Sequence, residues 1–154
     1  MQTHPSEAPT FYLNLHTADP SAAFTFFSAL DFTPVPEYSD SETKAFRFPA
    51  PNTSLCLMIH GQKRFKTFMR PDTETNDATK TTEALFSLTA DKKEVVDEIL
   101  GKAVKAGGSA DPFKLEDYGT SCGMYSRSFT DLDGHIWEVV AMLGAGPGCG
   151  KEGE

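Results

Sequence analysis

The sequence predicts an α+β fold made of two tandem β-α-β-β-β modules. The same order of strand-like and helix-like segments occurs twice along the chain, and the tripeptide Thr-Ala-Asp closes the first strand of each copy, at 17–19 and 89–91. The two tripeptides lie at the same point of two similar element orders, which favours an internal duplication. A chain of 154 residues has room for one domain formed by two small modules.

Residues 11–60 form the first predicted module. Side chains alternate between apolar and polar over 11–17, which indicates a strand. An Asp-Pro pair and apolar residues at helical spacing predict the helix that follows. The apolar stripe of this helix consists of Ala23, Phe26, Phe27 and Leu30. Strand-like runs separated by turn residues complete the module, at 34–39, 44–49 and 54–60.

Residues 83–142 form the second predicted module. It begins with a strand at 84–89, and the helix that follows over 91–108 ends at a Gly-Gly pair. The apolar stripe of this helix consists of Val95, Val96, Ile99, Leu100, Ala103 and Val104. Further strands are predicted at 110–115, 122–130 and 135–142. The polar or glycine-rich ends, 1–10 and 143–154, are predicted to be flexible tails.

The segment between the modules, 61–82, is long for a plain connection. It mixes basic side chains with aromatic ones, namely Lys63, Arg64, Lys66 and Arg70 with Phe65 and Phe68. Loops of this length often act as lids or binding elements, and its cations could steer an anionic ligand. The alternative is a module linker that contains a short amphipathic helix.

The composition is that of a folded, acidic protein. Hydrophobic residues make up 39% of the chain, with 12 Phe, and no apolar run approaches the roughly 18 residues of a membrane span. The N-terminus lacks the layout of a signal peptide, so a soluble, cytoplasmic protein is expected. A formal net charge of −8 disfavours nucleic acid as a partner. The 3 cysteines form no CxxC pair, which argues against a disulfide framework or structural zinc and favours reduced thiols.

A carboxylate, Glu138, lies within the nearly continuous apolar run that ends the second module. An ionised carboxylate among apolar neighbours is costly unless it is paired, hydrogen-bonded or bound to a metal. The run follows an Asp-x-Asp-Gly sequence at 131–134, in which Asp side chains and a Gly favour a tight turn between antiparallel strands. His135 in this turn is expected to be structural or exposed.

These residues carry a resemblance to a known family. The sequence Asp131-x-Asp133-Gly134-His135-x-x-Glu138 resembles the ending of the vicinal oxygen chelate superfamily, although Leu132 replaces the usual Pro. That superfamily includes glyoxalase I, bleomycin-resistance and fosfomycin-resistance proteins and extradiol dioxygenases. The segments "FKTFMRPDTETNDATKTTEALFSL" and "DYGTSCGMYSRSF" resemble an uncharacterised glyoxalase-like branch. The resemblance covers about 11–142.

The resemblance implies that the two sheets curl around a cavity, with helices outside, and that the Glu of the final strand points into the cavity as one of up to four metal ligands. The corresponding first-strand positions are Tyr12 and Leu85, and the fourth-strand position of the first module is near Met58. Of these positions, only that of Glu138 holds a residue able to bind a metal. A catalytic metal site needs about three protein ligands. No cofactor is therefore expected.

A shift of register would restore a ligand set. Alternation along the first strand places Tyr12, Asn14 and His16 on one face. It likewise places Cys56, Met58 and His60 on one face of the fourth strand. His16, His60 and Glu138 could then bind a divalent metal. On the strand before the final turn, Met124, Ser126 and Ser128 share the predicted cavity face, and Tyr125 and Arg127 lie on the other.

Two classes of function remain open, and whether the protein is an enzyme is open with them. The first is a lyase or isomerase acting on a small carbonyl compound or secondary metabolite, with Glu138 as base and Tyr12 or His16 polarising an oxygen. The second is binding or sequestration of a small molecule, as in resistance proteins of the superfamily. A metal-dependent, glyoxalase-like lyase is a third option. The predicted ligand-binding residues are Asn14, His60, Met58, Met124, Ser126 and Arg64. Paired modules of this kind often dimerise, so a homodimer is a further expectation.

Overall fold

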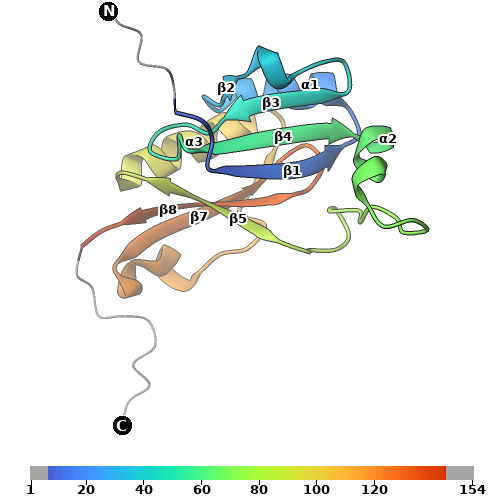
Figure 1. Cartoon of the computed structure of the whole chain (residues 1–154). Coiled ribbons are helices and arrows are strands. Elements are labelled where there is room, and N and C mark those ends of the chain that lie inside the picture. Colours follow the sequence, from blue (N-terminus) through green and yellow to red (C-terminus); the bar gives the residue numbers. More distant parts are fainter. Residues whose placement is uncertain (1–6, 145–154) are drawn as a thin grey trace, which may run out of the picture. The chain divides into compact units, whose positions relative to one another are not determined.

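The computed structural model describes residues 7–144, and the chain forms two compact units, Met1–Thr75 and Asn76–Glu154. Each unit contains a four-stranded mixed sheet, with the strand order β1-β4-β3-β2 in the first unit and β5-β8-β7-β6 in the second (Figure 1). In both sheets the first and last strands of the unit pair in parallel, and the other neighbours are antiparallel. The identical topology confirms the predicted pair of α+β modules.

The first unit follows the predicted element order, with short helices added. Its elements are β1 (Phe11–Thr17), α1 (Pro20–Ala29), β2 (Thr33–Pro34), η1 (Pro36–Tyr38), β3 (Thr43–Arg47), β4 (Leu55–Gly61), α2 (Gln62–Phe65) and η2 (Lys66–Phe68). The carboxylate of Asp19 caps α1 by accepting from the N–H groups of Ser21 and Ala22, at 3.0 and 3.1 Å. Helix α1 packs on β3 and β4, where the rings of Phe27, Phe32 and Phe46 form its core.

The second unit repeats this arrangement around a longer helix. Its elements are β5 (Leu85–Ala90), α3 (Lys93–Lys105), β6 (Ser109–Ala110), η3 (Glu116–Cys122), β7 (Met124–Thr130) and β8 (Ile136–Met142). Helix α3 covers one face of the sheet and buries Val96, Leu100 and Ala103. Trp137 is fully buried between Phe86 and Phe129, whose ring centroids lie 5.1 and 6.3 Å away.

Two of the predicted strands, 34–39 and 110–115, are wrong over most of their length. Each contributes only a two-residue strand, and a 3-10 helix follows, at once in the first unit and after a short loop in the second. Pro36 and Pro112 have no N–H to donate to a sheet, and Asp111 has a positive φ of 53° that turns the chain away from its neighbour.

Two expectations from composition can be compared with the described residues. Cys56 is a buried, free thiol, as expected, whereas Cys122 is disulfide-bonded, so the prediction of reduced thiols was wrong for Cys122. Within residues 7–144, no helix has both the length and the apolar character that crossing a membrane requires. Most of the predicted tails, 1–6 and 145–154, lies outside the described residues.

The turn between β7 and β8 is organised by Asp131, as its sequence predicted. One carboxylate oxygen accepts from the N–H groups of Asp133 and His135, at 3.0 and 3.1 Å. The other oxygen accepts from the indole N–H of Trp137 at 3.0 Å. Burial raises the pKa of the Asp131 carboxyl above its usual range. His135 is buried, so its structural interpretation holds and the exposed one does not.

Gly134 is required in this turn for two reasons. Its φ of +90° is a conformation that side chains rarely adopt. A Cβ at this position would lie 2.8 Å from the backbone nitrogen of Thr79 and 2.9 Å from the carbonyl carbon of Ala78, which are fixed backbone atoms. The turn and the segment before β5 therefore approach each other more closely than a residue with a Cβ at position 134 would allow.

Gly134→Ala should lower the free energy of unfolding by about 2 kcal/mol or more, because it adds backbone strain and a contact with the 78–79 backbone. The melting temperature of the variant should fall by about 5 °C or more in a chain of this length. Gly101→Ala is the matched control: its added Cβ meets nothing within 4 Å in α3, so it should stabilise by up to about 1 kcal/mol. Equal melting temperatures for Gly134→Ala and the wild type would contradict this account.

Candidate functional site

In each unit the longest helix, α1 or α3, packs on one face of the sheet, and the polar candidates of the strands lie on the opposite face. We call this opposite face the uncovered face, although residues 62–68 reach the ends of β1 and β4 in the first unit. In the first unit, Tyr12, Asn14 and His16 are paired with Cys56, Met58 and His60, respectively, across the parallel strands β1 and β4. Side chains of paired residues in neighbouring strands point to the same face. The predicted alternation of these two strands is therefore confirmed.

In the second unit, the uncovered face carries Glu138. Both of its carboxylate oxygens accept hydrogen bonds from serine hydroxyls: Oε1 from Ser87 at 2.7 Å and Oε2 from Ser126 at 2.8 Å. Ser87 comes from β5 and Ser126 from β7, the two neighbours of β8. The lone acid of the apolar strand is thus satisfied by the strands on either side of it and is partly exposed.

The contacts of Tyr125 and Arg127, on the opposite face of β7, confirm the orientation of Ser126 and Met124. The hydroxyl of Tyr125 donates to Asp97 of α3 at 2.7 Å, and Arg127 forms ion pairs with Asp97 and Asp111 at 3.3 and 2.9 Å. These side chains lie under the helix. Because alternate residues of a strand point to opposite faces, Met124 and Ser126 share the uncovered face with Glu138.

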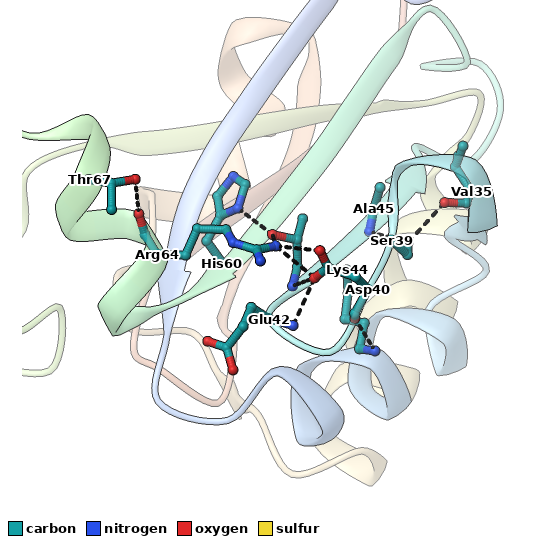
Figure 2. A network of polar contacts seen from close by, with 10 residues as sticks. Val35, Ser39, Asp40, Glu42, Lys44, Ala45, His60, Arg64 and Thr67 are labelled. Atoms are coloured by element: carbon teal, nitrogen blue, oxygen red, sulfur yellow. Dashed lines mark hydrogen bonds and ion pairs between the residues drawn. The ribbon is translucent and has the colours of Figure 1, made fainter.

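A chain of hydrogen bonds runs through the first unit from Asp40 to Asn14. Arg64 donates to both carboxylate oxygens of Asp40, at 2.6 and 2.7 Å, and to the hydroxyl of Thr43 at 2.8 Å (Figure 2). Thr43 Oγ1 lies 2.8 Å from Nδ1 of His60, and Nε2 of His60 lies 2.8 Å from Oδ1 of Asn14. We call these five residues the His60 relay.

The partners of His60 define its protonation. Burial, and then the Arg64 cation, lower the pKa of His60 below its usual range, while Asp40 opposes them. A neutral ring carries one proton, and the carbonyl oxygen of Asn14 can only accept, so the proton is on Nε2. Nδ1 then accepts from the hydroxyl of Thr43, whose oxygen accepts from Arg64. Every bond of the His60 relay thus points from Arg64 towards Asn14.

His16 is held by the segment after β4. Nε2 of Gln62 lies 2.9 Å from Nδ1 of His16, and Oε1 of Gln62 accepts from the hydroxyl of Thr75 at 2.9 Å. The Thr75 bond fixes the orientation of the amide, so Gln62 donates to His16. The ring of Phe65 meets the His16 ring edge-on at 5.4 Å. Residues 62–68 therefore pack at the ends of β1 and β4, and whether they act as a lid stays a prediction.

Tyr12 lies near the start of β1 and is partly exposed. Its ring is 6.4 Å from that of Tyr38. Desolvation, and then a hydrogen bond with Tyr38, raise the pKa of Tyr12 above its usual value of 10.0. The phenol is therefore protonated at neutral pH and is able to donate a hydrogen bond.

The structure assigns the predicted site residues to two groups. The first unit holds Tyr12, Asn14, His16, Met58, His60 and Arg64, and the second unit holds Met124, Ser126 and Glu138. Sequence reasoning missed Thr43, Gln62 and Ser87, which bind His60, His16 and Glu138. Alternation alone would put Ser87 on the correct face, but its pairing with Glu138 depends on the register of a parallel pair.

The contacts of His60 do not fit the predicted metal-ligand set. A histidine binds a metal through a ring nitrogen with an available lone pair. In His60, Nδ1 accepts from Thr43 and Nε2 carries the proton donated to Asn14. Binding a metal would require breaking one of these bonds at a histidine that is buried.

Within residues 7–144, the potential ligand atoms of Asp131, Asp133 and His135 lie within 4.8 Å of one another. The carboxylate oxygens of Asp131 already accept from two backbone N–H groups and from the indole of Trp137. The proximity of the three side chains is therefore explained by the turn, and we assign no metal to it.

Comparisons with known proteins identify the fold. No family model and no curated protein matches the chain. Among solved structures, a glyoxalase/bleomycin resistance protein/dioxygenase family enzyme from Burkholderia phytofirmans is similar with a TM-score of 0.68 and 17% identity, over 88% of this chain and 100% of that one.

Two further solved structures carry more specific names. A lactoylglutathione lyase from Agrobacterium tumefaciens matches with a TM-score of 0.57 and 18% identity, over 90% of this chain and 95% of that one. A genomically encoded fosfomycin resistance protein from Listeria monocytogenes matches with a TM-score of 0.58 and 16% identity, over 92% of this chain and 94% of that one. The chain therefore has the fold of the vicinal oxygen chelate superfamily, as its sequence predicted. At these identities, the likeness establishes the fold and not an activity.

Protein purified without added ions should contain no stoichiometric transition metal, because the nitrogens of His60 are engaged with Thr43 and Asn14. Inductively coupled plasma mass spectrometry measures this directly. About one equivalent of metal that is lost in both His60→Ala and Glu138→Gln would contradict the expectation and restore the set of His16, His60 and Glu138.

The pKa of Asp40 provides a test of the Arg64 end of the His60 relay. The Arg64 guanidinium, and then the N–H of Glu42, lower the pKa of Asp40 from 3.8 to about 2. A lowered carboxyl pKa stabilises the fold above the unfolded value, and this contribution is lost as the pH falls through the folded value near 2.

Arg64→Ala should raise the pKa of Asp40 towards 3.8, as followed by carbon NMR of the carboxyl group. The backbone N–H groups of Glu42 and Thr43 should still keep it somewhat low. Lys44→Ala is the control, because Lys44 donates to the backbone carbonyl of Asp40 and not to its carboxylate. A pKa that is unchanged in Arg64→Ala would show that the ion pair does not form in solution.

Proposed function

We propose that the protein is a small-molecule enzyme of the glyoxalase/bleomycin-resistance type, a lyase or isomerase in which Glu138 accepts a proton from a small carbonyl compound or secondary metabolite. The observation that carries this is the arrangement of Glu138 on an uncovered sheet face, with one oxygen held by Ser87 and the other by Ser126. Two hydrogen bonds from different strands fix the position of the carboxylate, and a base must be positioned before it is useful.

Two side chains of the first unit are suited to polarise a substrate oxygen. Tyr12 is a protonated phenol at neutral pH, and desolvation and Tyr38 raise its pKa above the usual value. His16 is oriented by Gln62 and Phe65. A hydrogen bond to a carbonyl oxygen stabilises the negative charge that develops when a neighbouring carbon loses its proton. The use of Tyr12 or His16 as this donor in the reaction of Glu138 stays a prediction from the sequence.

Binding without turnover is the second candidate, and exposed aromatic side chains favour it. Phe68 and Tyr12 are 62% and 44% exposed, and both lie beside polar groups of the first unit. Aromatic rings next to polar groups suit the sequestration of an aromatic or apolar ligand. A metal-dependent, glyoxalase-like reaction is the third option and depends on the metal content described above. A cytoplasmic location and a homodimer stay predictions.

Glu138→Gln should abolish proton transfer, by at least about 100-fold, while leaving the fold intact. The assay incubates the protein in deuterated water with methylglyoxal, lactoylglutathione or phenylpyruvate, and follows deuterium incorporation next to the carbonyl by proton NMR. The base removes a proton from this carbon, and the resulting enolate takes a deuteron back. Exchange above the buffer rate is expected for the wild type with at least one compound.

Glu98→Gln is the matched control, because Glu98 is an exposed acid of α3 in the same unit. Exchange in Glu138→Gln at the rate of the wild type would eliminate the role of Glu138 as base. Ligands that bind to the wild type and show no exchange would favour sequestration instead.

A further inference from the structure

We propose that Asn14 is a fixed hydrogen-bond donor for the oxygen of a bound carboxylate or carbonyl compound, and that the His60 relay sets its orientation. The ligand class is a small molecule with an oxygen acceptor attached to an aromatic or apolar body. This inference rests on the part of the proposed function in which a small molecule binds, and not on the proton transfer assigned to Glu138.

The orientation of the Asn14 amide follows from the direction of the relay. A side-chain amide has a donor end and an acceptor end, and reversing it exchanges the two. Oδ1 of Asn14 lies 2.8 Å from Nε2 of His60, which donates to it. The amino group of Asn14, with two N–H donors, then lies on the other side. Asn14 is exposed in the middle of β1.

The rest of the relay disfavours reversal of the amide. A reversed amide would need an acceptor on His60 Nε2, and the proton would have to move to Nδ1. Nδ1 faces the hydroxyl of Thr43, whose oxygen accepts from Arg64 at 2.8 Å. A proton on Nδ1 would add a second donor to this oxygen and take away the acceptor of the Thr43 hydroxyl proton. Arg64 in turn is held by two short bonds to Asp40. Each link therefore favours the same tautomer of His60 and the same orientation of Asn14.

The burial of the relay indicates that it does more than connect surface groups. It begins at an exposed ion pair, passes through Thr43 and His60, which are both only 4% exposed, and ends at the exposed Asn14. Buried polar side chains must have their hydrogen bonds satisfied. Here they are satisfied in a way that leaves the donor end of a surface amide available.

The surroundings of His60 define the rest of the ligand. The ring of Phe68 meets the His60 ring edge-on at 5.0 Å and is 62% exposed. Met58, which is paired with Asn14 on the neighbouring strand, is partly exposed. An oxygen acceptor at Asn14 would therefore lie near apolar surface, which suits an aromatic carboxylate or ketone.

The experiment compares two probes of the same size, 3-phenylpropionate and 3-phenylpropylamine. The first presents a carboxylate acceptor and the second an ammonium donor. In spectra of protein labelled with 15N, the carboxylate should shift the side-chain amide signals of Asn14 in a saturable manner, and the amine should not. Long-range spectra of His60 should show the tautomer protonated on Nε2 before the addition of either probe.

Thr43→Val tests the relay without removing a group that touches the ligand. The variant deprives Nδ1 of its donor, so the tautomers of His60 should mix and the affinity for 3-phenylpropionate should fall about threefold to tenfold. Thr33→Val is the matched control, since it removes an exposed hydroxyl from β2, outside the relay. If Thr43→Val does not fold, Asn14→Asp serves instead. It replaces the exposed donors by a carboxylate and should lower the affinity by about tenfold or more.

Three outcomes would overturn the proposal. The amine could shift the Asn14 signals while the carboxylate does not, His60 could be protonated on Nδ1, or neither probe could bind at Asn14. A loss of proton exchange in Glu138→Gln that leaves binding of 3-phenylpropionate unchanged would support both inferences. Binding at Asn14 by a wild-type protein that shows no exchange would support this proposal and remove the catalytic one.

Discussion

The parallel pairing of the first and last strands in each unit is the constraint on which both candidate sites depend. It brings residues that are more than forty positions apart in sequence onto one face: Asn14 and His60 through β1 and β4, and Ser87 and Glu138 through β5 and β8. The antiparallel neighbour of the last strand, β3 in the first unit and β7 in the second, adds the third group, Thr43 or Ser126. Each site is therefore assembled from three adjacent strands, which gives it a rigid base.

Hydrogen bonding explains how polar groups are retained on faces with many apolar neighbours. Glu138 lies between Trp137 and Val139, both fully buried on the helix side, and it points the other way to meet two serines. His60 is buried and has both ring nitrogens satisfied. An unsatisfied buried donor or acceptor costs about 1–3 kcal/mol. Removing Thr43 is therefore expected to affect the buried His60 more than the lost contact alone suggests.

The elements with strong periodicity could be predicted from the sequence, and the contacts between them could not. β1, α1, α3 and β8 have clear alternation or apolar stripes and occur close to where they were expected. The strands at 34–39 and 110–115 failed because prolines and a residue with positive φ interrupt short runs that look like strands. The face of Glu138 was correct, but the Ser87 hydroxyl on it depends on pairing across fifty-one positions, which no local pattern reveals.

The register of the two units shows how one topology carries two different sites. Asn14 pairs with Met58 in the first unit as Ser87 pairs with Glu138 in the second, so the position of the acid is apolar in the first unit. The next pair on the same face is His16 with His60 in the first unit and Thr89 with Val140 in the second. The titratable groups of the two faces therefore lie one pair of residues apart, at Glu138 in the second unit and at His16 and His60 in the first. Because alternate residues share a face, such a shift exchanges an acid for a histidine without disturbing the helix-covered core beneath.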